Sequence, residues 1–154
     1  MKYLLLFSTL VIMLQSCVFS AGSYPYAERY KFQISRIELI EKIHKFKQDN
    51  PEYKLMTTTK NGNIEEVPDS IIGGFYDIYF HIKDESLTFH CFINMSVEIE
   101  DTPTELGLSG VTYSKNFATW QRVNTNDLTK ERNEEIKKYF EEKILNRFGI
   151  WQRM

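Results

Sequence analysis

The longest regular pattern in the chain is an alternation of apolar and polar residues from 87 to 99. Alternation of this kind predicts a β-strand with one face toward a core. Residues 75–82 alternate in the same way, and the polar segment 83–86 between the two stretches is typical of a turn. The pattern therefore predicts two antiparallel strands joined as a hairpin.

The register of this hairpin follows from its apolar residues. A turn centred on the bond between Asp84 and Glu85 gives one face apolar cross-strand pairs only, namely Ile82–Leu87, Phe80–Phe89, Ile78–Cys91 and Tyr76–Ile93. A shift of one residue would set this apolar face against polar residues, so the register is well specified. Cys91 lies in the middle of the apolar face, which favours a small core residue over a nucleophile.

An amphipathic helix is predicted before the hairpin, at residues 36–49. Ser35 followed by Glu38 is a capping box, in which each side chain bonds to the other residue's backbone amide. The dipeptide Asn50-Pro51 is expected to end the helix. Its apolar stripe consists of Ile37, Ile40, Ile43 and Phe46.

A second amphipathic helix is predicted near the end of the chain. Its apolar residues recur at steps of three and four, and they are Ile136, Tyr139, Phe140, Ile144 and Phe148. We expect Asn126 or Asp127 to cap its start, and Gly149 suits a left-handed stop. Since each helix has one apolar face, both are expected to pack on the apolar face of a sheet.

Two weaker strand regions extend the predicted sheet. Residues 53–59 and 64–67 flank Asn61-Gly62, a strong hairpin turn signal. Residues 111–122 have strand composition but imperfect alternation, and residues 100–110, which contain proline and glycines, are expected to form a loop.

These elements predict the fold class. Helix, antiparallel strands and helix together indicate an α+β domain over residues 28–154, with an antiparallel sheet of about four to five strands and both helices packed on one face. The length of 154 residues fits one domain. A formal net charge of −2 gives no electrostatic case for nucleic acid as a partner, and two cysteines exclude a disulfide framework.

The start of the chain has the pattern of a targeting signal. Residue Lys2 precedes an apolar run over residues 3–14, which suits a secretory signal peptide. A membrane-spanning helix needs about 20 apolar residues. The segment at the start of the chain that reaches this length contains polar residues in its second half. An uncleaved anchor and plain secretion, with a cut after Ser20, remain as alternatives to the interpretation that follows.

Leu14-Gln15-Ser16-Cys17 resembles the lipobox of bacterial lipoproteins, with an aliphatic residue three positions before the cysteine and a small residue directly before it. Gln15 departs from the smaller or branched residue that is commoner there. The resemblance implies that residues 1–16 are a signal peptide, that Cys17 is lipidated and becomes the mature N-terminus, and that residues 17–27 form a tether. Several acyl chains on one cysteine would anchor the protein stably in a membrane.

The residue after the cysteine bears on the location. In lipoproteins generally an aspartate there can retain the protein at the inner membrane, whereas Val18 follows Cys17 here. We therefore expect the outer membrane, with the domain facing the periplasm. This location predicts a protein or another envelope component as the partner, and no nucleic acid.

The face of the hairpin opposite the apolar pairs holds the candidate chemistry. A binding surface is predicted there from Asp77, Tyr79, His81, His90 and Phe92. In the proposed register His90 is a diagonal neighbour of both His81 and Asp77, at roughly 7–8 Å, so these three residues could also converge on a metal or act in acid–base chemistry. A plain half-exposed sheet surface is the third interpretation.

Two classes of function follow. The first is a non-catalytic binding or assembly module on a lipid anchor, with inhibitor or immunity-type lipoproteins as a subclass. The second is a small metal-binding or hydrolytic enzyme centred on Asp77, His81 and His90. The sequence holds no phosphate-binding loop, serine nucleophile elbow or paired-cysteine metal motif, so we expect the first class, without a cofactor and with no catalytic residue assigned.

Overall fold

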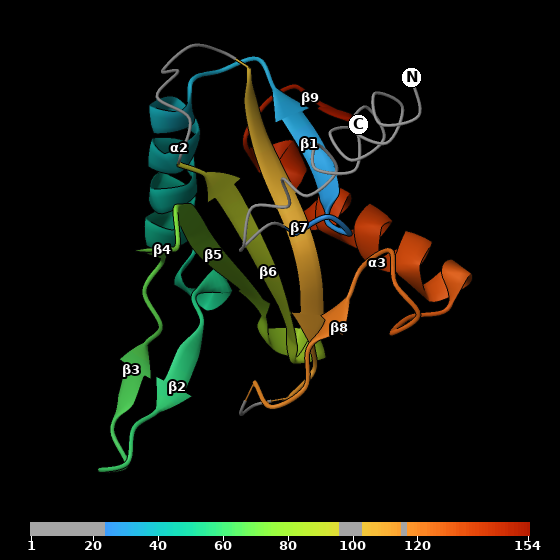
Figure 1. The fold of residues 1–154 in the computed structure, drawn as a ribbon. Helices are drawn as coiled ribbons and strands as arrows, with labels where there is room; N and C mark the ends of the chain where they lie inside the picture. Colours follow the sequence, from blue (N-terminus) through green and yellow to red (C-terminus); the bar gives the residue numbers. More distant parts are fainter. Residues whose placement is uncertain (1–23, 96–102, 115–116) are drawn as a thin grey trace, which may run out of the picture.

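The predicted hairpin forms the middle of the sheet in the computed structural model, which describes residues 24–95, 103–114 and 117–154 (Figure 1). Strand β5 (Phe75–Ile82) pairs with β6 (Leu87–Asn94) in antiparallel register, with Ile78 opposite Cys91 and Tyr79 opposite His90. This register confirms the prediction. The turn is a 3-10 helix at Lys83–Glu85, and Ser86 follows it in the left-handed region at φ 51°.

The sheet is larger than predicted. It contains seven strands in the order β4-β5-β6-β7-β1-β9, with β8 paired to β7, and the pairs are antiparallel. The further strands are β4 (Ser70–Ile72), β7 (Thr104–Thr112), β1 (Glu28–Phe32), β9 (Trp151–Arg153) and β8 (Gln121–Arg122). The expectation of four to five strands was therefore too low, because β1, β4, β8 and β9 have five residues or fewer and carry little pattern of their own.

The largest error concerns residues 100–110, which were predicted to be a loop. Residues 104–112 form β7, which lies between β6 and β1 in the middle of the sheet (Figure 1). Gly107 was interpreted as a loop residue, but it faces the ring of Phe92, and a Cβ atom at this position would lie 2.3 Å from Phe92 Cζ. The glycine makes room for a neighbouring ring inside a strand instead of ending that strand.

Two other strand predictions are altered. Among the described residues of this range, 111–114 and 117–122, only 111–112 and 121–122 lie in strands. The Asn61-Gly62 hairpin is present, with β2 (Met56–Thr58) paired to β3 (Ile64–Glu66) and Gly62 at φ 82°. This pair is a separate two-stranded sheet that extends away from the main body (Figure 1). The predicted continuation of β6 through residues 96–99 lies outside the described residues.

Both predicted helices are present. Helix α2 (Arg36–Asp49) begins as expected, since Ser35 Oγ accepts a hydrogen bond from the amide of Glu38 at 3.2 Å, and a 3-10 turn at Pro51–Tyr53 follows it. Helix α3 (Lys130–Lys143) is capped by Thr129, whose hydroxyl accepts from the amide of Arg132. Asn126 and Asp127 were therefore wrong as cap residues.

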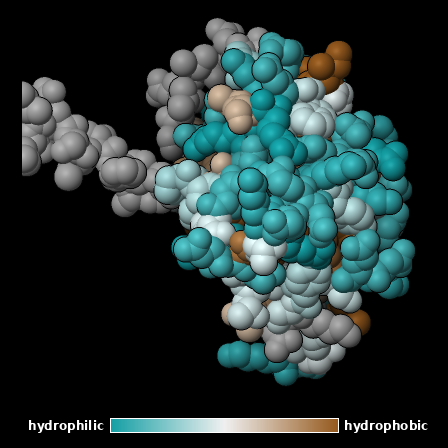
Figure 2. All heavy atoms as spheres, turned by 90° about the vertical axis from the view of Figure 1, so that its right-hand side faces the viewer, coloured by the Kyte–Doolittle hydropathy of each residue, from teal (hydrophilic) through white to brown (hydrophobic). Residues whose placement is uncertain are grey.

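The segment after α3 leads to the last strand, and residues of both helices contribute to the core. Helix α3 ends at Lys143, earlier than predicted, so Ile144 and Phe148 lie beyond it. A 3-10 turn at Leu145–Arg147 follows, and Gly149, at φ 115°, comes after that turn and before β9 instead of ending α3. The core cluster includes Leu39 and Ile43 of α2, Ile136 and Phe140 of α3, and Cys91, which is fully buried. The side of the molecule seen in Figure 2 is covered mainly by hydrophilic residues. Within the described ranges, no helix has the length and apolar character needed to cross a bilayer.

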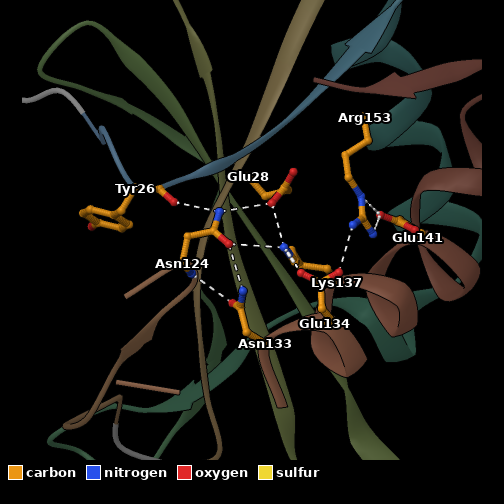
Figure 3. A network of polar contacts seen from close by, with 8 residues as sticks. All are labelled: Tyr26, Glu28, Asn124, Asn133, Glu134, Lys137, Glu141 and Arg153. Atoms are coloured by element: carbon orange, nitrogen blue, oxygen red, sulfur yellow. Dashed lines mark hydrogen bonds and ion pairs between the residues drawn. The ribbon is translucent and has the colours of Figure 1, made fainter. Parts of the chain in front are cut away.

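A partly buried polar network joins α3 to β1 and to the turn after β8 (Figure 3). The ammonium of Lys137 lies 3.0 Å from Glu28 Oε2 and 3.2 Å from Asn124 Oδ1. Asn124 in turn donates to the backbone carbonyl of Tyr26 at 3.1 Å. Burial alone would lower the pKa of Lys137, but its bonds to Glu134 and Glu28 outweigh burial and raise that pKa. The network thus fixes the backbone at Tyr26, the residue that leads into the site described next.

Candidate functional site

A cleft of about 320 Å³ opens on the sheet face opposite the core. Its lining residues come from the segment before β1 and from β5, β6, β7, β8 and the residue before β8; they are Tyr26, Tyr79, His90, Ser109, Gly110, Trp120 and Arg122. We call this site the aromatic cleft. Three aromatic rings, one imidazole and one guanidinium surround it, a composition typical of small-ligand sites.

The rings of the aromatic cleft hold the imidazole of His90 in place. Tyr79 stacks on His90 with ring centroids 5.1 Å apart and an interplanar angle of 21°. Trp120 contacts the same imidazole edge to face at 5.7 Å. Arg122 lies over the ring of Tyr26, with its guanidinium carbon 5.5 Å from the centroid. Stacked and edge-on aromatic contacts each add to the free energy of burial, so His90 has a defined orientation.

A chain of hydrogen bonds runs along the floor of the aromatic cleft. His90 Nε2 lies 2.9 Å from Asp77 Oδ1, and His90 Nδ1 lies 2.6 Å from Ser109 Oγ. Asp77 is 4% exposed and Ser109 is 3% exposed. The serine hydroxyl also lies 3.0 Å from the carbonyl oxygen of His90. Both nitrogens of the imidazole are therefore engaged by polar partners from neighbouring strands.

The serine reaches His90 through an irregularity in the strand pairing. His90 pairs with Gly110 and Cys91 pairs with Leu108, so Ser109 is an extra residue on β7 at this point. An extra residue in one strand is a β-bulge, which redirects side chains and occurs often beside functional sites. Ser109 could not be recognised from the sequence, because nothing in the local pattern marks a bulge.

The ring of Tyr24 packs on the sheet face that carries the aromatic cleft. Its ring stacks on Phe92 with centroids 4.4 Å apart and contacts Phe75 and His90 edge to face. Burial raises the pKa of Tyr24, and Asp77 adds to that effect. Tyr24 and Tyr26 both belong to the predicted tether of residues 17–27, so the last part of that segment packs against the sheet.

The structure brings together four of the five predicted binding residues. Asp77 and Tyr79 contact His90 directly, and Phe92 reaches it through Tyr24. His81 is separate, since its Nδ1 lies 3.0 Å from Thr88 Oγ1, and burial lowers its pKa. In the described part of the chain, no group of three or more His, Cys, Asp and Glu residues could hold a metal ion. The predicted lipidation site, Cys17, lies outside the described residues.

Described residues also line two further hollows. The larger, of about 500 Å³, opens at the end of α2 beside Phe46 and Phe148, and the exposed pair Lys45–Asp49 lines it. The other, of about 280 Å³, is lined by His44 and by the ion pair of Lys47 with Asp69, whose atoms lie 2.6 Å apart. The aromatic cleft is smaller than the first hollow, but it alone of the three combines several rings with a linked chain of buried polar groups.

Comparisons of the sequence with protein-family models and with curated proteins, and comparison with solved structures, gave no match. We therefore infer function from the geometry of the aromatic cleft and from the residues at the start of the chain.

Proposed function

We propose that this chain is a lipid-anchored protein of the cell envelope, facing the periplasm from the outer membrane, and that it binds a partner or ligand in the aromatic cleft. The observation that supports binding is the cleft itself, which is lined by three aromatic rings and by an imidazole held by buried polar groups. Support for the anchor is the lipobox-like sequence that ends at Cys17.

We infer further that both helices cover the opposite face of the sheet. Leu39 of α2 and Phe140 of α3 belong to one buried cluster with Ile78 and Cys91, which lie on that opposite face. Since successive residues of a strand point to alternate faces, Tyr79 and His90 are directed away from this cluster. This arrangement leaves the aromatic cleft uncovered by helices and available to a ligand.

The lining of the aromatic cleft favours a ligand with a flat, weakly polar surface. Tyr79 and Trp120 offer ring faces and edges to such a surface, and the guanidinium of Arg122 offers hydrogen-bond donors to an acidic group. An aromatic side chain on a protein partner and a sugar ring of an envelope component both have this shape. Because its polar floor is already bonded internally, the site loses little conformational freedom on binding.

The proposed anchor would keep the aromatic cleft close to a membrane. Residues 18–23 separate Cys17 from Tyr24, whose ring contacts His90 of the cleft. Seven residue steps of extended chain span at most about 25 Å. A domain on so short a tether stays close to the membrane surface. The proposed ligand must therefore lie within reach of that surface.

Photo-crosslinking tests the binding proposal. A benzophenone amino acid in place of Trp120 should form a specific adduct when the protein is irradiated in its native envelope. The matched control carries the same group in place of Ile150, which is 87% exposed and does not line the cleft. Adducts of equal yield from both positions, or none from position 120, would contradict the proposal. Adding Tyr79→Ala should lower the adduct yield at position 120 about tenfold, as expected for a loss near 1.4 kcal/mol.

Mass spectrometry of the mature N-terminus tests the anchor independently. We expect residues 1–16 to be absent and Cys17 to carry acyl chains. A Cys17→Ala variant should leave the membrane fraction, because a diacylated cysteine is the proposed attachment. An unmodified peptide that starts at Ala21 would show secretion instead, without bearing on the aromatic cleft.

A further inference from the structure

We propose that Ser109 is a nucleophile that forms an acyl intermediate with a small ester bound in the aromatic cleft. This inference rests on the proposed use of the cleft as a ligand site, and it adds a reaction to that site. The geometry behind it is the chain Ser109–His90–Asp77, with heavy-atom distances of 2.6 Å and 2.9 Å. A serine activated by an adjacent base, which is itself oriented by a carboxylate, is a recurrent arrangement for covalent catalysis.

The donor and acceptor roles within the hydrogen-bonded series Ser109–His90–Asp77 follow from the chemistry of each group. The Asp77 carboxylate only accepts hydrogen bonds, so we assign the proton of the neutral imidazole to His90 Nε2. His90 Nδ1 then carries a lone pair, and the Ser109 hydroxyl donates to it at 2.6 Å. The alternative acceptor, the carbonyl oxygen of His90, is more distant at 3.0 Å. The serine proton is thus directed at a base.

The roles of the two imidazole nitrogens are reversed relative to the serine protease triad, in which Nε2 faces the nucleophile. Either nitrogen of a neutral imidazole can accept a proton, so the reversal preserves the chemistry. The ring of His90 is also fixed from two sides, with Tyr79 stacked on it and Trp120 at its edge. A base with a fixed orientation needs little rearrangement to accept the proton.

The position of Ser109 connects the nucleophile to the cleft. Ser109 is 3% exposed as a whole residue, but it lines the aromatic cleft together with Gly110, which has no side chain to cover it. A Cβ atom at position 110 would lie 2.7 Å from the backbone oxygen of Gln121, so this position leaves no room for a larger residue. An ester that enters the aromatic cleft therefore meets Ser109 at its floor.

The reaction needs only the ester and water. Ser109 Oγ forms a bond to the carbonyl carbon while its proton passes to His90 Nδ1, and the carbonyl electron pair moves to oxygen. When the carbonyl re-forms, the bond to the alcohol breaks and the alcohol leaves with the proton from His90. Water then attacks the acyl-serine, gives a proton to His90 and releases the acid, and this proton returns to Ser109 Oγ.

The substrate class follows from the size and lining of the aromatic cleft. About 320 Å³ is near the lower limit for small-molecule sites, which restricts the bound portion to a small group. The rings of Tyr79 and Trp120 favour a flat, weakly polar group next to the ester. We therefore assign small esters with a flat acyl or alcohol portion as the substrates.

A fluorophosphonate probe tests this inference on the intact folded protein. The probe phosphorus is attacked by an activated serine with loss of fluoride, and intact-mass analysis should show one added group per chain. Peptide mapping of the wild-type protein should place that group on Ser109. The variant Ser109→Ala should lose labelling, and His90→Asn should slow it by about 100-fold or more. The matched control Ser70→Ala, in edge strand β4, should label at the wild-type rate.

Several results would overturn the inference. These are an unlabelled wild-type protein, a label mapped to another residue, or full labelling in Ser109→Ala. Mapping on the wild type keeps the test valid if a variant does not fold, and circular dichroism checks the fold of each variant. Crosslinking from position 120 reports on binding alone. Its persistence without labelling at Ser109 would refute the reaction and leave the binding proposal standing.

Discussion

The ring of Phe92 lies against the backbone of Gly107, on the neighbouring strand of the sheet, so closely that a Cβ atom there would come within 2.3 Å of Phe92 Cζ. Both residues are central to the face that carries Tyr24 and the aromatic cleft. The contact explains why a glycine stands in the middle of a nine-residue strand.

Gly107→Ala should destabilise the protein, because the added methyl group and the ring of Phe92 cannot occupy the same space. We expect the free energy of unfolding to fall by about 1–3 kcal/mol, as in other overpacked sites. Urea denaturation measures the change. The double variant Gly107→Ala with Phe92→Leu should recover part of the loss, since the smaller side chain relieves the clash. A double variant that is less stable than Gly107→Ala would contradict this explanation.

Removing Tyr24 and Tyr26 should expose Phe92, which is 2% exposed in the structure. A chain that starts at residue 28 should be less stable than one that starts at residue 23 by about 2–4 kcal/mol, from lost apolar burial and ring stacking. Urea denaturation of the two truncated proteins gives the comparison. Equal stabilities would show that residues 24–27 act only as a tether.

The neutral imidazole of His90 should carry its proton on Nε2, because Asp77 accepts a hydrogen bond there. Two-bond 15N–1H correlation spectra distinguish this tautomer from the alternative. Asp77→Asn, with the amide group directed at the ring, should increase the population of the Nδ1–H tautomer. An Nδ1–H tautomer in the wild-type protein would mean that the Ser109 hydroxyl donates to the carbonyl of His90 instead of to the ring.

The pair of Lys47 and Asp69 is almost fully buried, with side-chain exposures of 8% and 6%. Lys47→Met should lower the free energy of unfolding by about 3–5 kcal/mol, because it leaves the carboxylate of Asp69 buried without its partner. Lys47→Met combined with Asp69→Leu should recover much of this loss. The exposed pair of Lys45 with Asp49 provides the control, and Lys45→Met should change stability by less than about 1 kcal/mol.

Alkaline pH should destabilise the protein through Tyr76. Burial, followed by the charge of Asp69, raises the pKa of Tyr76 to about 12. Above pH 10 the unfolded chain releases the phenol proton while the folded protein keeps it, so the free energy of unfolding falls between pH 10 and about 12. Tyr76→Phe should make this decrease smaller, measured by urea denaturation at pH 8, 10 and 11. An unchanged pH dependence would exclude Tyr76 as a contributor.

Much of the secondary structure could be predicted because its signals are local. The apolar pairs of the hairpin allow one register, and the structure has Ile78 opposite Cys91 as expected. Ser35 and Glu38 predicted the start of α2 in the same way. Asp77, Tyr79 and His90 could be placed on one face for the same reason, since side chains alternate along a strand.

The remaining features depend on contacts between distant residues. Strand β7 contains glycines that resemble loop signals, and its place in the sheet is explained by the ring of Phe92 on another strand. Thr129, instead of Asp127, caps α3, because the Asp127 carboxylate accepts from the amide and side chain of Arg122. Neither outcome can be read from neighbouring residues alone.

The hairpin register, the two amphipathic helices, the burial of Cys91 and the set of residues that share a face with His90 could be predicted from the amino-acid pattern alone. The contact of His81 with Thr88 and the meeting of Ser109 with His90 and Asp77 depend on how the strands are arranged in three dimensions. Periodicity specifies which face of an element is apolar, whereas a β-bulge and the strand order specify which polar side chains meet.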